Sequence, residues 1–249
     1  INNYEKSLEI LHKVRNVKFK SEVLNNLGSG YEDLGNLSKA LELFKESSDI
    51  AETIGVDLML ATTKGNMGRV FNNLGESLFQ IQQNLDATIA VEVTKINSLT
   101  EEIAALNKAI HANEPTTFSA NDLRDKRDLK VKELSELIDL NFVDEQDGQI
   151  SLTFGDGTPL VLQSTAFTLD TTINGNNKSF KDIVVQDPSG NSTNITSSIS
   201  GGALKGYLDM RDTEVETVRD KLDRLAAGFV QEFNNIHQQG FGIDGSTGN

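Results

Sequence analysis

Histidine and cysteine, two residue types that often carry catalysis or metal binding, are sparse or absent in this 249-residue sequence. It contains three histidines and no cysteine, which excludes disulfides, thiolate metal sites and cysteine nucleophiles. The histidines, His12, His111 and His237, are far apart in the sequence, and none stands at metal-ligand spacing from another. Neither a glycine-rich phosphate loop nor a serine nucleophile elbow occurs. We therefore predict no catalytic residue, no metal and no cofactor.

Acidic turns are the remaining candidates for ion binding. The run DEQDG begins at Asp144, and Asp244-Gly245 lies near the C-terminal end. Both lack the alternating oxygen ligands and the closing glutamate of a dedicated calcium loop. Carboxylates are frequent throughout the chain, but none lies in a recognisable catalytic context. The sequence thus predicts a protein that is not an enzyme.

Two arginines interrupt the apolar stripes of predicted helices, and their charges need an explanation. Arg127 lies on the stripe of one predicted helix, and Arg211 interrupts a second helix in the same way. A guanidinium in a protein core must be paired. We hypothesise that both arginines hold their helices in register through nearby aspartates: Asp122, Asp125, Asp128, Asp209 and Asp212. The open alternative is that both side chains extend along the surface to reach water.

Two long helices are expected to bury one face each. Apolar residues recur every three or four positions over about residues 77–111 and, with one seven-residue gap, over about 203–238. At 1.5 Å per residue both helices would be about 50 Å long, so we expect them to pack on each other in a bundle. Pairing of each helix with a second copy of the chain is the open alternative. The stripes consist of Leu78, Ile81, Leu85, Ile89, Val93, Ile96, Leu99, Ile103, Leu106 and Ile110, and of Leu204, Leu208, Val215, Val218, Leu222, Leu225, Phe229, Phe233 and Ile236.

A shorter helix and a β region are predicted between the long helices. The segment of about residues 120–139 has a helical stripe, with an aspartate suited to its first turn. From about residue 140 to 198 the apolar period changes to two, with a hairpin signal at Asp147-Gly148. The expected fold class is therefore mainly α, with a small antiparallel β insertion in a long-helix bundle.

The N-terminal 75 residues contain an internal repeat with a period of 40 residues. The segment NLGSGYEDLG beginning at Asn26 recurs as NMGRVFNNLG beginning at Asn66. Helix, glycine turn and helix follow one another, so this stretch resembles the tetratricopeptide repeat, and we expect helical hairpins. The resemblance implies a peptide-binding groove that includes Asn25, Ser29 and Arg69. The alternative is a solvated helical face, and fewer than three such repeats rarely fold alone.

The charge balance limits the kinds of partner. The formal net charge is −14, which argues against general binding to nucleic acid or to an anionic membrane surface. The charge is uneven, because residues 1–75 carry 9 Lys+Arg and 10 Asp+Glu while residues 76–249 carry 14 and 27. No apolar run approaches about 18 residues, so we predict no membrane insertion. The N-terminal segment lacks the basic start and apolar core of a secretory signal.

Three sequence blocks carry a further resemblance, and they occur in a set order around the β region. They read INSLTEEIAALNKAI, then ANDLRDKRDLKVKELSELIDL, then GGALKGYLDMRDTEVETVRDKLDRLAAGFVQEFNNIHQQG. From about Ser77 to Asn249 the chain resembles the flagellar hook-associated protein 1 family, the hook–filament junction proteins of bacterial flagella. The resemblance implies a structural protein, exported by the flagellar secretion apparatus, that lies outside the cell on the flagellum. It also implies partners: the hook protein, the filament-side junction protein and other copies of itself.

Two regions are therefore expected. Residues 1–75 would form a tetratricopeptide-like region, and residues 76–249 a middle domain like that of the hook-associated protein. The repeat-like stretch stands where the family would have its upstream helical region, so we expect residues 1–75 to be a foreign or naturally fused helical segment. The leading expectation for function is a structural component of the hook–filament junction that acts by protein–protein packing. The alternative is a peptide-binding or regulatory adaptor, in which the repeats bind and the long helices serve as a coiled-coil spacer.

Overall fold

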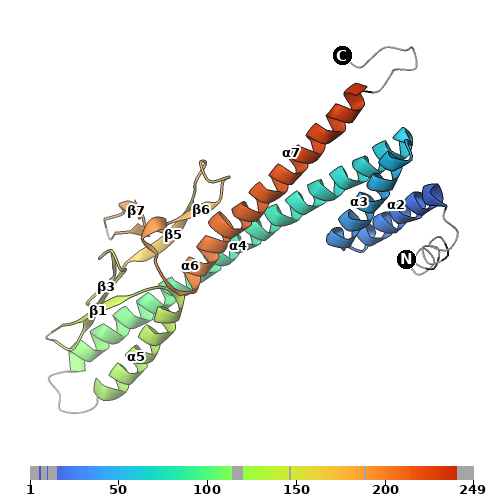
Figure 1. Ribbon diagram of the computed structural model, residues 1–249. Helices are drawn as coiled ribbons and strands as arrows, with labels where there is room; N and C mark the ends of the chain where they lie inside the picture. Colours follow the sequence, from blue (N-terminus) through green and yellow to red (C-terminus); the bar gives the residue numbers. More distant parts are fainter. Residues whose placement is uncertain are drawn as a thin grey trace. The chain divides into compact units, whose positions relative to one another are not determined.

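The computed structural model describes residues 6, 10, 16–113, 120–145, 147–187 and 189–239. Figure 1 labels most of their helices and strands. The chain divides into two compact units. Unit 1 combines residues 1–79 with residues 217–249, and unit 2 comprises Gln80–Glu216. Two helices, α4 (Asp57–Asn113) and α7 (Val215–Gln239), contribute residues to both units.

Unit 1 begins with a helical hairpin whose ends are specified by local capping. α2 spans Val17–Asp33 and α3 spans Leu37–Thr53. Each starts after an asparagine, Asn16 or Asn36, whose side chain accepts a hydrogen bond from a backbone N–H of the first turn. Gly35 follows the C-cap of α2, has a φ of 75° and donates one of the two backbone hydrogen bonds of a Schellman motif. α3 ends in the same way, so the helical hairpin expected from the repeat is present.

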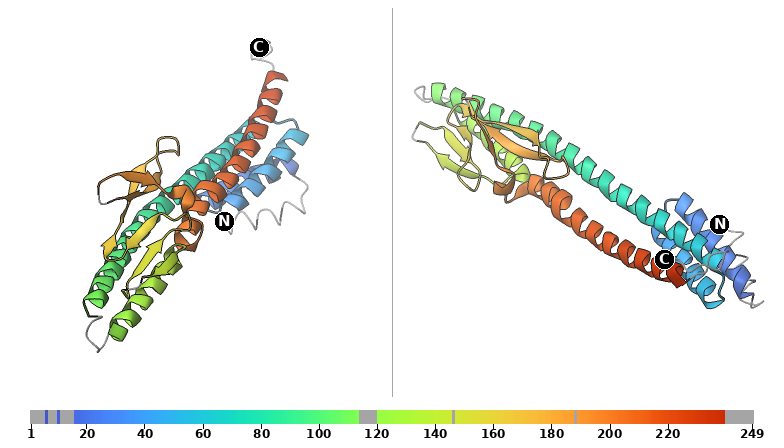
Figure 2. Two further views of the ribbon diagram at one scale, coloured as in Figure 1. Left: turned by 90° about the vertical axis from the view of Figure 1, so that its left-hand side faces the viewer. Right: turned by 90° about the horizontal axis from the view of Figure 1, so that it is seen from above.

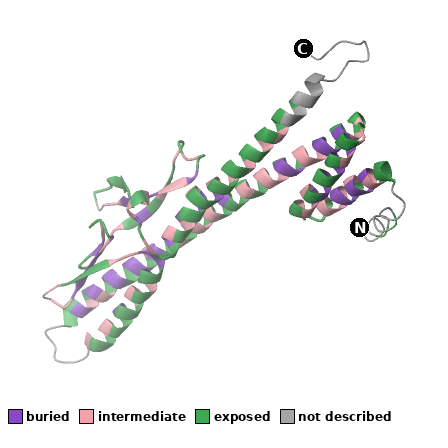
Figure 3. Ribbon diagram, in the orientation of Figure 1, coloured by how far each residue is buried: buried purple, intermediate pink, exposed green. Residues whose placement is uncertain are grey.

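The two helices of this hairpin approach each other closely at Gly28. A β-carbon placed there would lie 2.7 Å from Cε1 of Phe44, whose side chain is fully buried. Glycine is thus required at this position by packing. A buried series of hydroxyls, Ser21, Ser47 and Thr63, links α2, α3 and α4. Figure 3 shows the buried segments on both helices of the hairpin.

The helix α4 is longer than the sequence analysis predicted. It is continuous for 57 residues from Asp57, whereas the long helix was expected to begin near residue 77. Three glycines lie inside it: Gly65, Gly68 and Gly75. A glycine costs a helix about 1 kcal/mol relative to alanine but keeps its backbone N–H, so it weakens a helix without ending it. Tertiary packing of the buried Val70 and Phe71 offsets this weakness.

Unit 2 contains two small antiparallel sheets between its helices. The first sheet has the order β1-β2-β3-β4 and the second β5-β6-β7. The bounds are α5 Ala120–Leu137, β1 Asn141–Asp144, β2 Ile150–Thr153, β3 Pro159–Leu162, β4 Thr165–Ala166, β5 Thr168–Ile173, β6 Lys181–Gln186 and β7 Ser192–Asn194, followed by a 3₁₀ turn at Thr196–Ser198. Figure 2 shows from two further sides that both sheets lie along the C-terminal part of α4, beside α5. The predicted fold class, mainly α with a small antiparallel β region, is confirmed.

One hydrophobic core joins the parts of unit 2. Helices α4 and α5, both sheets and α6 (Gly202–Asp209) each contribute buried apolar side chains. The predicted stripe of α4 is buried at Ile89 and Ile103, whereas Ile81 is 46% exposed. The largest fully buried members of this core are Ile89, Ile96, Ile103, Leu134, Ile138, Leu152, Phe154 and Leu160. Removal of this apolar surface from water is the main stabilising term for the unit.

The C-terminal helix was predicted as one regular helix, but it contains a π-helical turn. α6 passes into this turn at Met210–Glu214, and α7 follows it. The N–H of Val215 donates to the carbonyl of Met210, five residues back, as in a π-helix. The turn coincides with the seven-residue gap in the apolar stripe.

The prediction that the whole stripe of this helix is buried is wrong. Leu204, Leu208 and Val215 are buried, but Val218 is 49% and Leu225 is 59% exposed. The reason is that the core of unit 2 ends near Val215. In unit 1 the helix instead packs through Phe229, whose ring centroid lies 5.7 Å from that of Phe71 in an edge-to-face arrangement. The side chains of Phe233 and Ile236 lie outside the described residues.

The close approach at Gly28 generates a first prediction. Gly28→Ala is expected to lower the thermal midpoint of unfolding, because overpacking against Phe44 costs about 1–3 kcal/mol and exceeds the gain in helix propensity of about 1 kcal/mol. Gly68 stands 40 residues later in the repeat, and a β-carbon there meets nothing within 4 Å. Gly68→Ala should therefore raise the midpoint. Thermal denaturation followed by circular dichroism measures both, and equal shifts in one direction would contradict the packing argument.

Candidate functional site

Three polar side chains on one face of α4 hold the sheets of unit 2. Asp86, Asn97 and Asn107 are eleven and ten residues apart, and three turns of an α-helix take about 10.8 residues. The three side chains therefore point from the same face of the helix. We call them the α4 polar row. Asn107 is fully buried, and the side chain of Asp86 is 13% exposed.

Two members of the polar row bond to strands as a neighbouring strand would. Asn97 donates through Nδ2 to the carbonyl of Leu169 and accepts through Oδ1 from the N–H of the same residue, both at 2.8 Å. Asn107 does the same with Ile150, at 2.7 and 3.2 Å, and also donates to the carbonyl of Gln163 at 2.6 Å. These bonds satisfy backbone groups of β2 and β5 that the small sheets leave without a strand partner.

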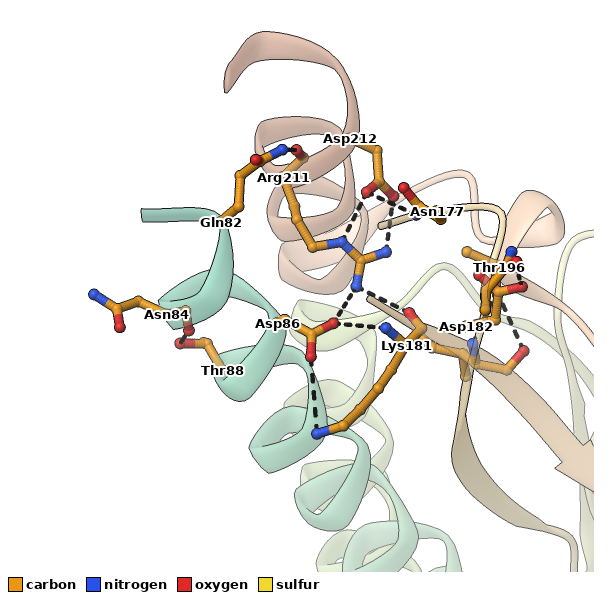
Figure 4. A network of polar contacts seen from close by, with 12 residues as sticks. Gln82, Asn84, Asp86, Thr88, Asn177, Lys181, Asp182, Thr196, Arg211 and Asp212 are labelled. Carbon is orange, nitrogen blue, oxygen red and sulfur yellow. Dashed lines mark hydrogen bonds and ion pairs between the residues drawn. The ribbon is translucent and has the colours of Figure 1, made fainter. Parts of the chain in front are cut away.

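Asp86 connects the polar row to Arg211 (Figure 4). Its Oδ1 accepts from the N–H of Lys181 at 2.8 Å and from Nη1 of Arg211 at 2.7 Å. The same guanidinium nitrogen donates to the carbonyl of Lys181 at 2.9 Å. One carboxylate and one guanidinium thus hold both backbone groups of the first residue of β6.

The other side of the Arg211 guanidinium is occupied by its neighbour in the chain. Nε and Nη2 donate to the two carboxylate oxygens of Asp212, each at 2.8 Å, in a bidentate pair. Asp212 also accepts from Nδ2 of Asn177 at 3.2 Å. The guanidinium lies 5.5 Å from the centroid of the Phe180 ring, within cation–π range. We call the set Asp86, Lys181, Arg211 and Asp212 the arginine clasp.

The electrostatics of the clasp keep a fully buried cation charged. Burial alone would lower the pKa of Arg211, since it disfavours the charged form. The hydrogen bonds and negative charges of Asp212 and Asp86 outweigh burial, so the pKa of Arg211 is raised above its ordinary value. The guanidinium of Arg211 therefore keeps its positive charge although it is buried.

The π-helical turn gives Arg211 a second connection to α4. The backbone carbonyl of Arg211 accepts from Nε2 of Gln82 at 2.8 Å, and the same amide nitrogen also bonds to the carboxylate of Glu216. Lys178 forms an ion pair with Glu216 as well. The turn, the sheet and α4 are thus joined through both the backbone and the side chain of one residue.

Arg127 is buried but is satisfied mainly by neutral oxygens. Its Nη1 donates to the carbonyl of Gly148 at 2.9 Å and to Oδ1 of Asn107 at 3.2 Å. Its only ion pair among the described residues is with Asp128, at 3.6 Å from Nε, and the side chain of Asp128 is 70% exposed. Arg127 therefore ties α5 to the β1–β2 turn and to the polar row, with little contribution from charge pairing.

The structure brings together only part of the predicted set of ion pairs. Asp212 pairs with Arg211, and Asp128 lies at the margin of contact with Arg127. Asp122 and Asp125 are exposed, while Asp209 pairs with Lys205 at 2.7 Å. The main partner of Arg211, Asp86, was not among the predicted residues. The signal that could have found it is the three-turn spacing of polar residues at 86, 97 and 107 along a helix face that is otherwise apolar.

The predicted repeat groove is largely satisfied within the chain. Nδ2 of Asn66 donates to Oδ1 of Asn25 at 2.9 Å. Arg69 donates through two nitrogens to Glu32, each at 2.7 Å, and this hydrogen bonding raises the pKa of Arg69. Ser29 is half-buried, and Asn25 borders a pocket of about 380 Å³. Oδ1 of Asn25 and the guanidinium of Arg69 thus have partners within the chain.

Asp139 links the end of α5 to the start of α6. Its carboxylate accepts from the hydroxyl of Ser200 at 2.6 Å and from the N–H groups of Ser200 and Gly201 at 3.1 and 3.0 Å. Burial raises the pKa of Asp139, but these hydrogen bonds together lower it below the ordinary range. Gly202, with a φ of 77°, allows the start of α6 to approach the end of α5, since a β-carbon there would lie 2.4 Å from the backbone of Leu137.

The described residues contain neither a metal-binding cluster nor a membrane-spanning helix. Among the described residues, no three His, Asp or Glu side chains gather as a metal site would require. His111 lies 3.2 Å from Asp147, in an isolated pair. His12, the side chain of His237 and the acidic turn at Asp244 lie outside the described residues. In the part of the chain that the structure describes, no helix has the length and apolar character that a membrane crossing needs.

Comparison with known proteins gives a consistent result. A family model described as the flagellar hook-associated protein FlgK helical domain matches residues 34–249. Flagellar hook-associated protein 1 of Bacillus subtilis is 28% identical over 206 residues, and that of Escherichia coli is 27% identical over 181 residues. These alignments cover 73% and 72% of this chain. They cover only 40% and 33% of the two relatives, so the chain spans less than half of their length.

A solved structure shares the fold of the chain. The flagellar hook junction protein FlgK from Burkholderia pseudomallei matches all of this chain and 43% of its own length, with a TM-score of 0.68 and 23% identity. The match includes the N-terminal hairpin, and the family model begins at residue 34, inside the stretch that resembles tetratricopeptide repeats. The hairpin is therefore part of a fold that occurs in a solved hook junction protein.

The contrast between the two buried arginines generates a second prediction. Arg211→Met should lower the free energy of unfolding by about 3–5 kcal/mol, because it leaves the largely buried carboxylate of Asp86 with only the more distant ammonium of Lys181, whose Nζ lies 3.8 Å from Oδ2. Arg127→Met is the matched control, and it should lose only about 1–3 kcal/mol, because the oxygens it leaves are neutral. Urea denaturation of both variants measures the difference.

The same comparison tests the register hypothesis. In the double variant Asp86→Leu with Arg211→Met, both buried charges are absent, so part of the loss should be recovered. If Arg211→Met is as stable as the unaltered chain, the clasp does not hold the helices and the sheet together.

The low pKa of Asp139 generates a third prediction, which concerns pH. Asp139→Asn should lower the free energy of unfolding by about 1–2 kcal/mol at pH 7. A carboxyl whose pKa is lowered on folding stabilises fully above its unfolded pKa of about 3.9, and this stabilisation is lost as the pH falls through the folded pKa. The difference in the free energy of unfolding between the unaltered protein and the Asp139→Asn variant should thus be constant from about pH 5 to 7 and shrink below about pH 4. Asp122→Asn, at an exposed position, controls for the change in net charge, and a difference that grows toward low pH contradicts the assignment.

Proposed function

The chain belongs to the family of the flagellar hook-associated protein FlgK helical domain, and on this basis we propose that it is a structural component of the bacterial flagellum at the hook–filament junction. It acts by protein–protein packing. The observation that carries the proposal is the family match over residues 34–249, that is, over both units of the structure. The names of the relatives and of the solved structure agree with it.

The architecture of unit 2 suits a load-bearing role. The polar row and the arginine clasp attach two small sheets to one long helix through hydrogen bonds that are mostly shielded from water. Such bonds have defined directions and resist sliding of the sheets along the helix. A stiff element of this kind can present a constant surface to neighbouring subunits in an assembly.

The partners and location follow from the proposed role. The chain packs against the hook protein, the filament-side junction protein and other copies of itself. It is exported by the flagellar secretion apparatus and resides outside the cell on the flagellum. Its role is structural and not enzymatic, as expected for a family whose members are described as hook-associated or junction proteins.

The N-terminal hairpin belongs to the same functional part. Residues 1–75 were expected to form a separate tetratricopeptide-like region, and their similarity to the solved junction protein supports an origin within this family's fold. The alternative role as a peptide-binding adaptor has less support. Its key side chains, Asn25 and Arg69, are occupied by Asn66 and Glu32.

Binding to purified flagellar subunits tests the proposal. The immobilised chain is expected to retain the hook protein or the filament-side junction protein of its own organism, and to retain flagellin poorly. Asn25→Ala combined with Arg69→Ala should change this retention less than about twofold, because those side chains pair within the chain. The adaptor role would replace the junction role if the chain retained neither subunit and captured peptides that the double variant does not capture.

A further inference from the structure

A pocket in unit 1 contains a buried lysine that has no hydrogen-bond partner. The pocket has a volume of about 370 Å³ and is bordered by α3, α4 and α7. Lys64 of α4 is 4% exposed, and its Nζ forms no hydrogen bond with any described residue. The ammonium lies 5.9 Å from the centroid of the Phe229 ring, which also borders the pocket, so the side chain points into it.

The environment of Lys64 leaves its charge poorly compensated. An ammonium removed from water without a paired anion is strongly disfavoured. The cation–π contact with Phe229 offsets only part of this, because such contacts are weaker than charge-assisted hydrogen bonds. An incoming anion would supply the missing hydrogen bonds at Nζ.

The charges around the pocket favour an anionic ligand. The lining of the pocket includes three cationic side chains, Lys45, Lys64 and Arg224, and two carboxylates, Asp49 and Glu52. The pocket therefore carries a net positive charge within a chain of net charge −14. Asp49 and Glu52 are exposed to water, and neither forms a hydrogen bond with the ammonium of Lys64. Their hydrated carboxylates therefore leave the buried cation available.

The remaining lining is apolar and selects among anions. Met67, Phe71 and Phe229 border the same pocket, and they favour an anion attached to an apolar group over a small hydrated one. We propose that this pocket binds the carboxylate of an acidic residue flanked by apolar residues, on an extended peptide segment of another protein chain. The proposal rests on the pocket and is independent of the function proposed above.

A pair of blocked peptides provides the test on the unaltered chain. The probes are acetyl-Leu-Glu-Leu-amide and acetyl-Leu-Gln-Leu-amide, used at about 0.15 M salt, where exposed charges more than about 8 Å apart are screened. The chain has three methionines, and only Met67 borders the pocket, so the ¹³C-methyl resonances of Met59 and Met210 serve as internal controls. The glutamate peptide is expected to shift the Met67 signal alone, and to bind about tenfold or more tightly than the glutamine peptide.

A matched pair of variants identifies the responsible cation. Lys64→Leu should abolish the response of Met67 and raise the thermal midpoint, because it removes a buried charge without a partner. Lys95→Leu makes the same change of charge at an exposed position of α4 and should leave binding within about twofold. Unchanged signals of Met59 and Met210 report that each variant is folded.

Three outcomes would overturn the proposal. Equal affinity for the glutamate and glutamine peptides would show that no carboxylate is recognised. Equal affinity for sodium acetate and the glutamate peptide would reduce the site to an adventitious ion only. A full response of Met67 in the folded Lys64→Leu chain would show that Lys64 does not take part.

Discussion

The structure of unit 2 depends on the satisfaction of backbone groups that its two small sheets leave exposed. A sheet of three or four short strands has many N–H and C=O groups for few strand partners, and burying such groups unpaired is unfavourable. Asn97 and Asn107 meet this constraint by taking the place of an adjacent strand at Leu169 and Ile150. An apolar helix face would bury the same sheets but could not fix where along the helix they sit.

Arg211 extends this arrangement to a third element. Because its guanidinium is planar and has five donors, it can bond to Asp86, to the carbonyl of Lys181 and to both oxygens of Asp212 at once. A lysine at this position could not satisfy the same set in one geometry. Arg211 lies within the π-helical turn. Its side chain bonds to the sheet from there, and its backbone carbonyl accepts a hydrogen bond from Gln82.

The sequence predicted the helices and strands far better than the polar contacts between side chains. Apolar periodicity predicted the long helices, α5 and the β region, because burial of a face depends mainly on local pattern. It placed Arg211 on a buried stripe, and Asp212 was one of the five aspartates hypothesised as partners of the two arginines. The three-turn spacing of Asp86, Asn97 and Asn107 could have indicated a shared helix face but not their partners, because a polar residue on a helix usually faces water and its partner is set by tertiary structure. The exposure of Val218 and Leu225 was missed for the same reason, since periodicity shows a stripe but not what covers it.

The continuity of α4 has a consequence for folding. The two units meet inside helices, between Phe79 and Gln80 and between Glu216 and Thr217, and not in loops. Each α-helical hydrogen bond joins residues four apart, so several such bonds in α4 have one end in each unit. Helix formation propagates more easily than it starts. Helix that forms in the core of unit 2 therefore lowers the entropic cost of extending α4 into unit 1.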